Sequence, residues 1–448
     1  MATTRSKTAA VLVGLLSILF AGPTVYNADL PRTFKVMGVF RQSANTAITH
    51  PSNLVVIADT PHCEDLHYHG PSRLIFTACE ADNSTRYSWF PPLANMDDPS
   101  VTLNSRGSIH VVDPKSMKAQ RLELEDFEGP FVTHGIDVIS DPEKLAGEAV
   151  YIFAVNHVPN HAYYDKLSRP DLGGGSSDVP KVRSRIEIFY HEIGSTVARH
   201  LRSVWDPLIV TPNDVVALSP SSFFVTNDHF YREGLLRHVE DIFRAAKWTN
   251  TVHVTLETLS TSVSDTEGVK ASVALDKMHN NNGLGHGRSA DEVLVVECAS
   301  GVLNLGRASR NETAPPTISI EDSVRFDSVI DNPSYFADPF ADIGHDGSSY
   351  LLPGLGRAAD LHKAIRDKSG KEPVPSMVWT AKVISPPDGM GRSWETKLLF
   401  EDDGSRIRSA SAAVQVAIDP AEEDGRKRAW LFVSGFMSEN VIAVKVDV

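Results

Sequence analysis

Short apolar runs separated by polar turns recur from about residue 50 to the end of the chain. The runs are rich in β-branched and aromatic residues and are bounded by Gly, Pro, Asp and Ser, a pattern typical of β-strands. They fall at 54–58, 73–78, 108–113, 149–155, 185–190, 214–218, 222–226, 292–296, 376–383, 413–418, 429–433 and 440–446. Their number and spacing predict an all-β fold of repeated antiparallel sheets, as in a β-propeller. No sharp repeat fixes the number of blades, and a pair of β-sandwiches is the structural alternative.

One segment has helical spacing instead. Between residues 234 and 248 the apolar side chains recur at 235, 236, 239, 242, 243 and 246, which places them on one face. We expect an amphipathic helix near one mouth of the fold, packed on the core or, alternatively, serving as a lid or membrane contact. Residues 167–180, 261–291 and 341–375 interrupt the strand pattern and look like insertions. The first is rich in glycine and is expected to form a loop.

The N-terminus has the features of a targeting segment. Arg5 and Lys7 precede an uncharged, largely apolar run from residue 8 to residue 22. This arrangement predicts a signal peptide or membrane anchor over residues 1–28 and an N-terminus on the cytoplasmic side. We expect residues 40–448 to form a single domain in the secretory pathway, either secreted or held at a membrane on its luminal or extracellular side. The glycosylation sequons at Asn83 and Asn311 agree with this route.

The composition limits the class of protein. The chain has 448 residues, of which 42% are hydrophobic and 22% are charged, so it can bury a large core. Its formal net charge of −14, with no dense run of Lys or Arg, argues against a nucleic-acid partner. Three cysteines allow one disulfide and one free thiol. Cys63 and Cys79 flank one short segment and are the favoured pair, but pairings with Cys298 stay open.

Pairs of adjacent oxygen-bearing side chains stand at the edges of strand-like runs. Carboxylate and amide oxygens are ligands that suit Ca²⁺ and not zinc. Neighbouring residues on a strand point to opposite faces, so Glu64 and Asp65 could serve two different ions, and so could Asn213 and Asp214. The pairs are Glu64-Asp65, Asn213-Asp214 and Asp331-Asn332, and Asn280, Asn281 and Asn282 stand beside Gly283. Taken singly, such motifs are more often turns than metal sites.

Two histidines, His134 and His157, lie between the first two pairs in the chain. Oxygen ligands together with histidines indicate a calcium-dependent hydrolase. Calcium polarises a carbonyl, and a histidine can take a proton from water. A second histidine would hold the first in the required tautomer. The alternative is that each histidine is a hydrogen-bonded structural residue.

A zinc site is the competing interpretation near the first pair. Two cysteine or histidine side chains on each side of Glu64 and Asp65 could serve as ligands: His62, Cys63, His67 and His69. Their spacing matches no standard zinc pattern.

Seven motifs follow one another in an order that resembles the serum paraoxonase/arylesterase family, over roughly residues 50 to 335. They are Glu64-Asp65-Leu66, His134-Gly135-Ile136, Val155-Asn156-His157, Asn213-Asp214-Val215-Val216-Ala217, Thr226-Asn227-Asp228-His229, Asn282-Gly283 and Asp331-Asn332. The resemblance implies a six-bladed β-propeller with two Ca²⁺ ions in its central tunnel. It also implies hydrolysis of small-molecule lactones and aryl esters.

The same resemblance assigns individual residues. A catalytic calcium would be held by the side chains of Glu64, Asn213, Asn282, Asp331 and Asn332. A structural calcium would be held by Asp65, Asp214 and the main-chain carbonyl of Ile136. The family's catalytic histidine dyad falls on His134 and His157.

The sequence also departs from the family. The family closes its propeller with a disulfide that reaches the end of the chain, whereas no cysteine follows Cys298 here. We therefore expect closure by strand pairing, with any Cys63–Cys79 bond serving elsewhere. Substrate-pocket residues do not align, so the natural substrate stays open. Two other functions remain: a non-catalytic, calcium-stabilised interaction module, and a propeller enzyme similar to gluconolactonase or strictosidine synthase.

Overall fold

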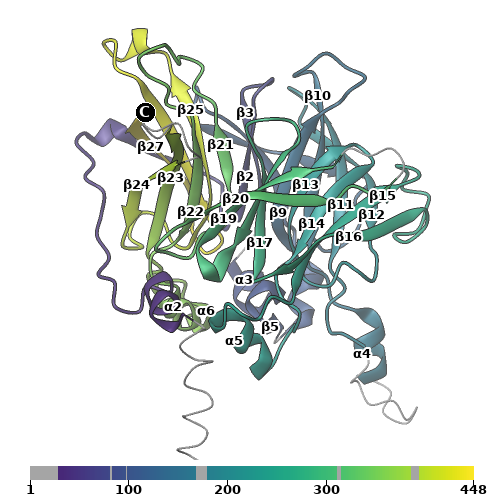
Figure 1. The fold of residues 1–448 in the computed structure, drawn as a ribbon. Coiled ribbons are helices and arrows are strands. Elements are labelled where there is room, and N and C mark those ends of the chain that lie inside the picture. The colour runs from purple at the N-terminus through teal and green to yellow at the C-terminus, as the bar shows by residue number, and fades with distance from the viewer. Residues whose placement is uncertain (1–28, 81–82, 97, 168–178, 310–313, 385–392) are drawn as a thin grey trace, which may run out of the picture.

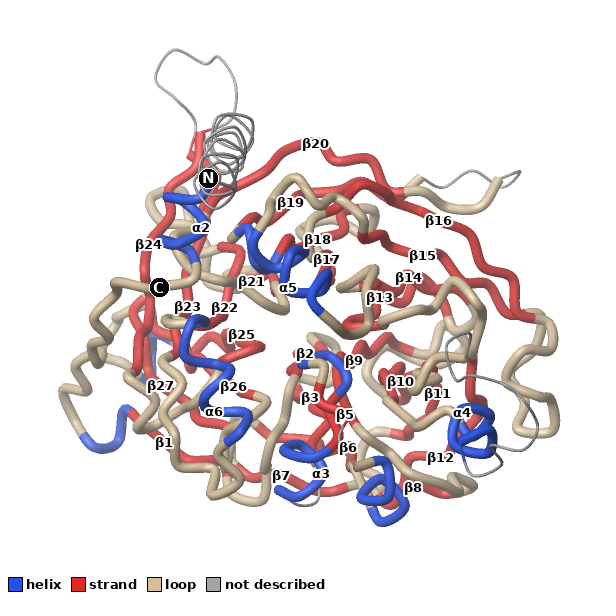
Figure 2. Tube along the Cα trace, turned by 90° about the horizontal axis from the view of Figure 1, so that it is seen from below, coloured by secondary structure: helices blue, strands red, loops and turns tan. Residues whose placement is uncertain are grey.

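The computed structural model describes residues 29–80, 83–96, 98–167, 179–309, 314–384 and 393–448. Six antiparallel sheets stand in a ring around a central axis, which confirms the predicted six-bladed β-propeller (Figures 1 and 2). The leader at residues 1–28, Asn311 and most of the predicted loop at 167–180 lie outside the described residues.

The first three blades contain the strands from β2 to β16, except for β4 and β5. One blade contains β2 (Asp65–His69), β3 (Leu74–Cys79), β6 (Ser108–Asp113) and β7 (Lys118–Arg121). The next contains β9 (Thr133–Ser140), β10 (Ala149–Asn156), β11 (Arg185–Glu192), β12 (Val197–Val204) and a parallel edge strand, β8 (Glu123–Glu125). The third contains β13 (Pro212–Ser219), β14 (Ser222–Asn227), β15 (Thr249–Leu256) and β16 (Val269–Met278).

The other three blades complete the ring. The fourth blade contains β17 (Asn281–His286), β18 (Glu292–Glu297), β19 (Val302–Ala308) and β20 (Ile318–Arg325). The fifth contains β21 (Ser334–Phe336), β22 (Ser349–Leu355), β23 (Ser376–Ile384) and β24 (Ser393–Asp402). The sixth contains β25 (Ala410–Ile418), β26 (Arg428–Gly435), β27 (Val441–Asp447) and β1 (Leu54–Ile57). A separate two-stranded hairpin joins β4 (Trp89–Phe90) to β5 (Asn95–Met96).

The blades pack face to face through apolar side chains. One cluster joins Phe153 and Ile186 of one blade to Val215, Phe223 and Val252 of the next, all at most 2% exposed. The sequence of a strand that is covered on both faces is a continuous apolar run, because neither face contacts water. This is why every apolar run predicted as a strand is found within or overlapping a strand of the structure.

The ring closes without a disulfide at its ends, as expected. The first strand, β1, pairs antiparallel with the last, β27, from Leu54 opposite Val444 to Ile57 opposite Val441. The disulfide joins Cys63 to Cys79 within one blade, which confirms the favoured pair, and Cys298 is free.

Among the described residues, five short α-helices gather at one end of the ring, the lower end of Figure 1. They are α2 (Leu30–Val36), α3 (Asn83–Ser88), α4 (His161–Leu167), α5 (Leu235–Ile242) and α6 (Leu361–Arg366). Single 3₁₀ turns are η1 (Pro51–Asn53), η2 (Pro91–Leu93), η3 (Pro99–Asn104), η6 (Cys298–Ser300), η7 (Ala358–Asp360) and η8 (Pro420–Glu422). The predicted amphipathic helix is α5, although it ends early because Phe243 adopts an extended backbone. No helix in the described ranges is long and apolar enough to cross a membrane.

Two of the expected insertions are regular parts of the propeller. Residues 261–291 contain β16 and β17, and residues 341–375 contain β22 and α6. The prediction failed because β16 exposes much of its length as an outer strand and β17 carries asparagine and glycine. Asn282 therefore lies within β17, where the pairing with β18 is irregular between Asn281 and Leu284, and not in an added loop.

Candidate active site

The inner strand of each blade lines the axis, and these strands are β2, β9, β13, β17, β21 and β25 (Figure 2). They deliver the predicted ligand residues from four different blades to the end of the axis that the helices cover. A cavity of about 300 Å³ at this end is bordered by Glu64, His134, Asn213, Asn282 and Asp331, among others. The fifth predicted ligand, Asn332, joins them because its Nδ2 donates a 3.0 Å hydrogen bond to Glu64 Oε1.

The predicted ligands share one unusual property: each carries a buried oxygen without a hydrogen-bond partner among the described residues. These atoms are Glu64 Oε2, Asn213 Oδ1, Asn282 Oδ1, Asp331 Oδ1 and Asn332 Oδ1. A buried polar group left unpaired costs about 1–3 kcal/mol, so five together require a compensating partner. Two carboxylates and three amide oxygens match the hard donor set that Ca²⁺ prefers. The residues therefore fit a calcium ion.

The amides are essential to this fit. Within the described part of the chain, no group of three or more His, Cys, Asp or Glu side chains is placed to hold a metal ion. Amide ligands keep the charge of the donor set low, which favours a hard cation that can still polarise a bound carbonyl.

Glycines let the inner strands approach closely enough for the site. A Cβ on Gly283 would lie 2.7 Å from Asn332 Cα and 2.9 Å from Asn332 Oδ1. A Cβ on Gly135 would lie 2.5 Å from Asp214 Oδ1. Any side chain at either position would push neighbouring strands apart, because real Cβ atoms do not approach other atoms this closely.

The second predicted pair, Asp65 and Asp214, lies deeper in the tunnel. Asp65 accepts hydrogen bonds from the N–H groups of Leu66 at 2.8 Å and Ile136 at 2.9 Å. Asp214 accepts from Val215 and Leu284, both at 2.7 Å. Ile136 thus meets Asp65 through its N–H, whereas the sequence-based assignment uses its carbonyl. Burial raises the pKa of Asp65 to about 7 and, together with the charge of Asp65, raises that of Asp214.

The two predicted histidines meet beside the ligand cluster. His157 Nε2 lies 3.1 Å from His134 Nδ1, and His157 Nδ1 lies 2.8 Å from Ser184 Oγ. His134 Nε2 is 3.8 Å from Glu64 Oε1. Burial lowers the pKa of His134 well below its usual value and lowers the pKa of His157 to about 3. Both rings are therefore neutral near pH 7, the state in which an imidazole can accept a proton.

Aromatic and charged residues hold the histidine pair in place. The Phe90 ring contacts His134 and His157 edge-on, with centroids 5.2 and 6.0 Å apart. Trp89 Nε1 donates a 2.9 Å hydrogen bond to the His157 carbonyl. The Arg86 guanidinium stacks 4.0 Å from the centroid of Phe90. The sequence analysis did not identify these residues, because nothing in the local pattern distinguishes them from core.

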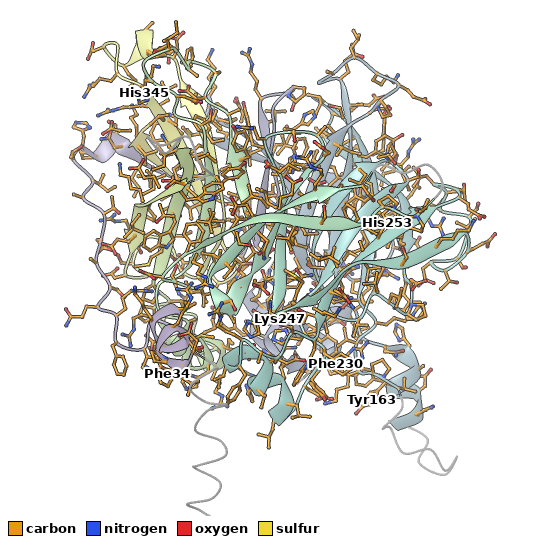
Figure 3. All side chains as sticks on the ribbon, in the orientation of Figure 1. Phe34, Tyr163, Phe230, Lys247, His253 and His345 are labelled. Carbon is orange, nitrogen blue, oxygen red and sulfur yellow. A yellow bond between two sulfur atoms is a disulfide. The ribbon has the colours of Figure 1, made fainter. Side chains whose placement is uncertain are left out.

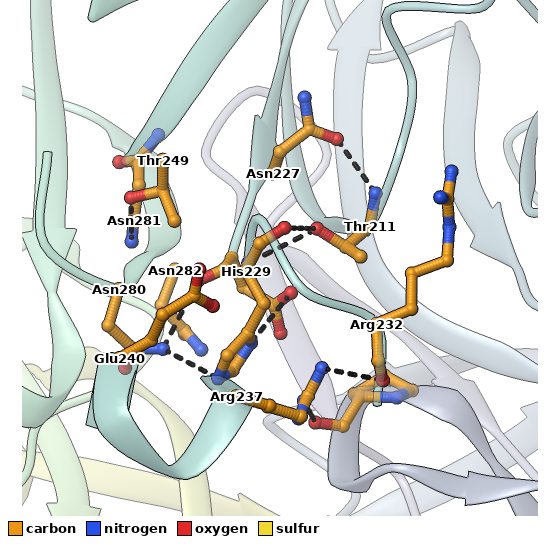
Figure 4. A network of polar contacts seen from close by, with 12 residues as sticks. Thr211, Asn227, His229, Arg232, Arg237, Glu240, Thr249, Asn280, Asn281 and Asn282 are labelled. Carbon is orange, nitrogen blue, oxygen red and sulfur yellow. Dashed lines mark hydrogen bonds and ion pairs between the residues drawn. The ribbon is translucent and has the colours of Figure 1, made fainter. Parts of the chain in front are cut away.

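A charged network that the sequence analysis also missed borders the same cavity (Figure 4). His229 contacts Asp228 at 3.0 Å and Asp241, on α5, at 2.8 Å. Burial alone lowers the pKa of His229, but Asp228 outweighs it and raises that pKa to about 9. Burial alone would raise the pKa of Asp228, but the charge and hydrogen bond of His229 outweigh burial and lower that pKa. The motif Thr226-Asn227-Asp228-His229 marked this place in the sequence, although it gave no role.

The alternative zinc ligands near the first pair do not converge. Cys63 is in the disulfide, and His67 Nδ1 lies 2.8 Å from Asp137 Oδ1 near the opposite mouth of the tunnel. His69 lies 2.8 Å from the hydroxyl of Ser72 and 2.8 Å from that of Ser140.

The other cavity walls are largely apolar. Leu93, Val329, Leu355, Leu361, Ile365 and Phe436 line it, and the free Cys298 also borders it. A substrate with an apolar body and one polar, polarisable group would therefore find matching surfaces.

The chain is similar to known proteins in parts of its sequence and in its fold. A family model described as arylesterase matches residues 177–278. Serum paraoxonase/arylesterase 2 of Rattus norvegicus is 28% identical over 155 residues, covering 34% of this chain and 36% of the relative. Serum paraoxonase/arylesterase 1 of Mus musculus is 24% identical over 202 residues, covering 45% of each chain. The solved structure of a luciferin-regenerating enzyme covers 88% of this chain and 95% of its own, with 9% identity and a TM-score of 0.43.

The matched stretches span 36% of the rat protein and 45% of the mouse protein. The sequence comparisons thus support a paraoxonase-like relationship for this chain.

Proposed function

We propose that this protein is a calcium-dependent hydrolase of lactones and aryl esters. The observation that carries the proposal is the set of five unpartnered buried oxygens beside a buried, neutral histidine pair. The arylesterase match and the paraoxonase relatives support the same class of substrate, a small ester or lactone.

The roles of the residues follow from their positions. A calcium ion held by Glu64, Asn213, Asn282, Asp331 and Asn332 would polarise the ester carbonyl. His134 accepts the proton of the attacking water, because its ring is neutral and stands beside the ligands. His157, held by Ser184, orients the His134 ring and shares its charge. The apolar wall of the cavity holds the body of the substrate.

We further propose a second, structural calcium between Asp65 and Asp214. Support comes from the two buried carboxylates, which come from separate blades and whose pKa values are both raised. Each carboxylate oxygen keeps a lone pair beyond the one that accepts a backbone N–H, so both can still bind an ion. Such an ion would crosslink blades whose strands are far apart in sequence.

Removal of calcium should abolish hydrolysis and lower the melting temperature together. A ligand that binds only the folded state stabilises it by roughly 2.7 kcal/mol when its concentration is 100-fold above Kd. We would measure turnover of a panel of lactones and aryl esters, and thermal unfolding, in calcium and in EDTA, with calcium restored as a control.

The panel also separates the competing functions. Calcium-dependent melting without hydrolysis of any ester would favour the non-catalytic interaction module. Hydrolysis that survives EDTA would contradict the proposed mechanism, and hydrolysis of sugar lactones alone would favour the gluconolactonase-like enzyme.

We also propose that the chain enters the secretory pathway and that the domain lies at a membrane surface. The basic and apolar leader supports the route. Support for membrane contact comes from exposed apolar side chains at the helical end, where Phe34 is 46% and Phe230 59% exposed (Figure 3). Leu235, the first residue of α5, is 84% exposed. Luminal calcium would fill oxygen-ligand sites that resting cytosol leaves empty.

A chain that starts at Asp29 should stay active but associate much less with membranes, because it keeps only the exposed apolar side chains of the domain and lacks the leader. Fractionation of cells that express the full and shortened chains checks this, with glycosidase treatment to probe Asn83 and Asn311. Full-length protein that is cytosolic and unglycosylated would refute the localisation.

A further inference from the structure

The disulfide joins two residues that each precede a buried glutamate next to the site. Cys63 precedes Glu64, and Cys79 precedes Glu80. The two half-cystines are only 1% and 0% exposed, and the two glutamates 1% each. The bond therefore fixes the start of β2 to the end of β3 beside the tunnel mouth.

The Glu80 side of the bond reaches the histidine pair. Glu80 Oε1 accepts hydrogen bonds from the N–H of Thr133 at 2.8 Å and from its hydroxyl at 3.2 Å. Ser105 donates a 3.3 Å hydrogen bond to Glu80 Oε2. Since Thr133 directly precedes His134, Glu80 fixes the backbone from which the proposed base projects.

The Glu64 side of the bond is the proposed ligand itself. The Glu64 N–H donates to the Ala78 carbonyl at 3.3 Å, and hydroxyls of Ser411 and Ser434 donate to the Glu64 carbonyl. The side chain has less support, because Oε1 accepts only from Asn332 and Oε2 has no hydrogen-bond partner among the described residues. Its position therefore depends on a fixed backbone.

One buried cation links the two sides. The Arg86 guanidinium donates to the carbonyl of His62 at 3.0 Å and to that of Thr133 at 3.3 Å. The residues that flank the disulfide and the residue before His134 thus form one hydrogen-bonded unit.

We propose that the Cys63–Cys79 disulfide positions the active site: it holds Glu64 for the cation and, through Glu80 and Thr133, holds His134 for proton transfer. The roles of Glu64 and His134 rest on the proposed function. Without the bond the blade keeps its fold, because β2 and β3 stay paired from Asp65 opposite Ala78 to His69 opposite Leu74. Two electrons and two protons from a dithiol would convert the bond to two thiols, the dithiol closing to a disulfide. Reduction would loosen the site, and because both sulfurs are buried, a dithiol reaches them only when the blade opens locally.

The test replaces both cysteines, Cys63→Ser with Cys79→Ser, so that no unpaired thiol is created. Amide hydrogen exchange should become about tenfold faster in segments 62–66 and 131–134, with β17 and β21 unchanged. Calcium affinity, measured by competition with a chelating dye, should fall about tenfold or more, since Glu64 is displaced. At saturating calcium, kcat of the double variant should stay below that of the wild type while KM changes little, because His134 is also displaced.

A control separates positioning from general stability. Phe400 is fully buried in β24, in another blade, so Phe400→Leu should lower the melting temperature without changing exchange in the two segments or calcium affinity. Unchanged exchange and affinity in the double variant, or equal changes in Phe400→Leu, would overturn the proposal.

A second measurement tests the proposal on the native protein if the double variant does not fold. The native protein is treated with dithiothreitol, its thiols at 63 and 79 are counted by alkylation and mass spectrometry, and exchange is measured again. Reduced protein with unaltered exchange in both segments also overturns the proposal. A wild-type chain that binds no calcium would refute the proposed function instead, and the exchange data would still decide the role of the disulfide.

Discussion

Replacing Asp331 with alanine should remove nearly all ester hydrolysis and weaken calcium binding at least about 100-fold. Loss of a group that only orients a metal ligand costs about 10–100-fold in affinity, and Asp331 would contact the ion directly. Its Oδ1 is one of the unpartnered buried oxygens, and its N–H is held by the Pro353 carbonyl at 2.8 Å. Dye competition for calcium and turnover of an aryl ester measure the two effects.

The matched control is Asp424→Ala. The side chain of Asp424 is 96% exposed and stands away from the cavity, so both properties should be unchanged. Asn213→Ala should act like Asp331→Ala, because Asn213 supplies another of the proposed ligand oxygens. Normal calcium affinity in either ligand variant would remove that residue from the proposed site.

Replacing His134 with glutamine should leave calcium binding intact while lowering kcat about 10²–10⁴-fold, the range expected for loss of a general base. Glutamine retains a hydrogen-bonding group of similar reach but cannot accept the proton. Steady-state kinetics beside calcium titration separates this outcome from the loss of a ligand.

The control for this variant is His345→Gln, at the opposite end of the propeller (Figure 3). It should match the wild type in both measurements. Full activity of His134→Gln would exclude the histidine pair from proton transfer and leave Asp228, which borders the same cavity, as the next candidate.

The middle strands of the blades were more predictable from the sequence than the exposed outer strands or the inner strands that form the site. Runs such as residues 149–155 and 429–433 are apolar because both faces of the strand are covered by neighbouring blades. The inner strands β2, β9 and β17 instead carry histidine, aspartate, asparagine and glycine, since they face the axis. Functional residues therefore replace the apolar pattern in the strands that position them.

The ligand residues were predicted from the order of short motifs and not from local pattern. No periodicity shows that Glu64 and Asn332 share a hydrogen bond, because they come from different blades. The contacts of Glu80 and Arg86 with Thr133 also join separate segments, so their roles became visible only with the fold. The Cys63–Cys79 disulfide could be predicted from the sequence because both residues border one short segment.

The pairing of β1 with β27 also orders the events of biosynthesis. Because Leu54 pairs with Val444, the ring cannot close until nearly the whole chain has left the ribosome. At a synthesis rate of about 5–20 residues per second, the first blades keep unpaired strand edges for on the order of tens of seconds. Such edges are prone to aggregation. The residues of the site come from separate blades, so the nascent chain should bind the proposed cation last and depend on chaperones until then.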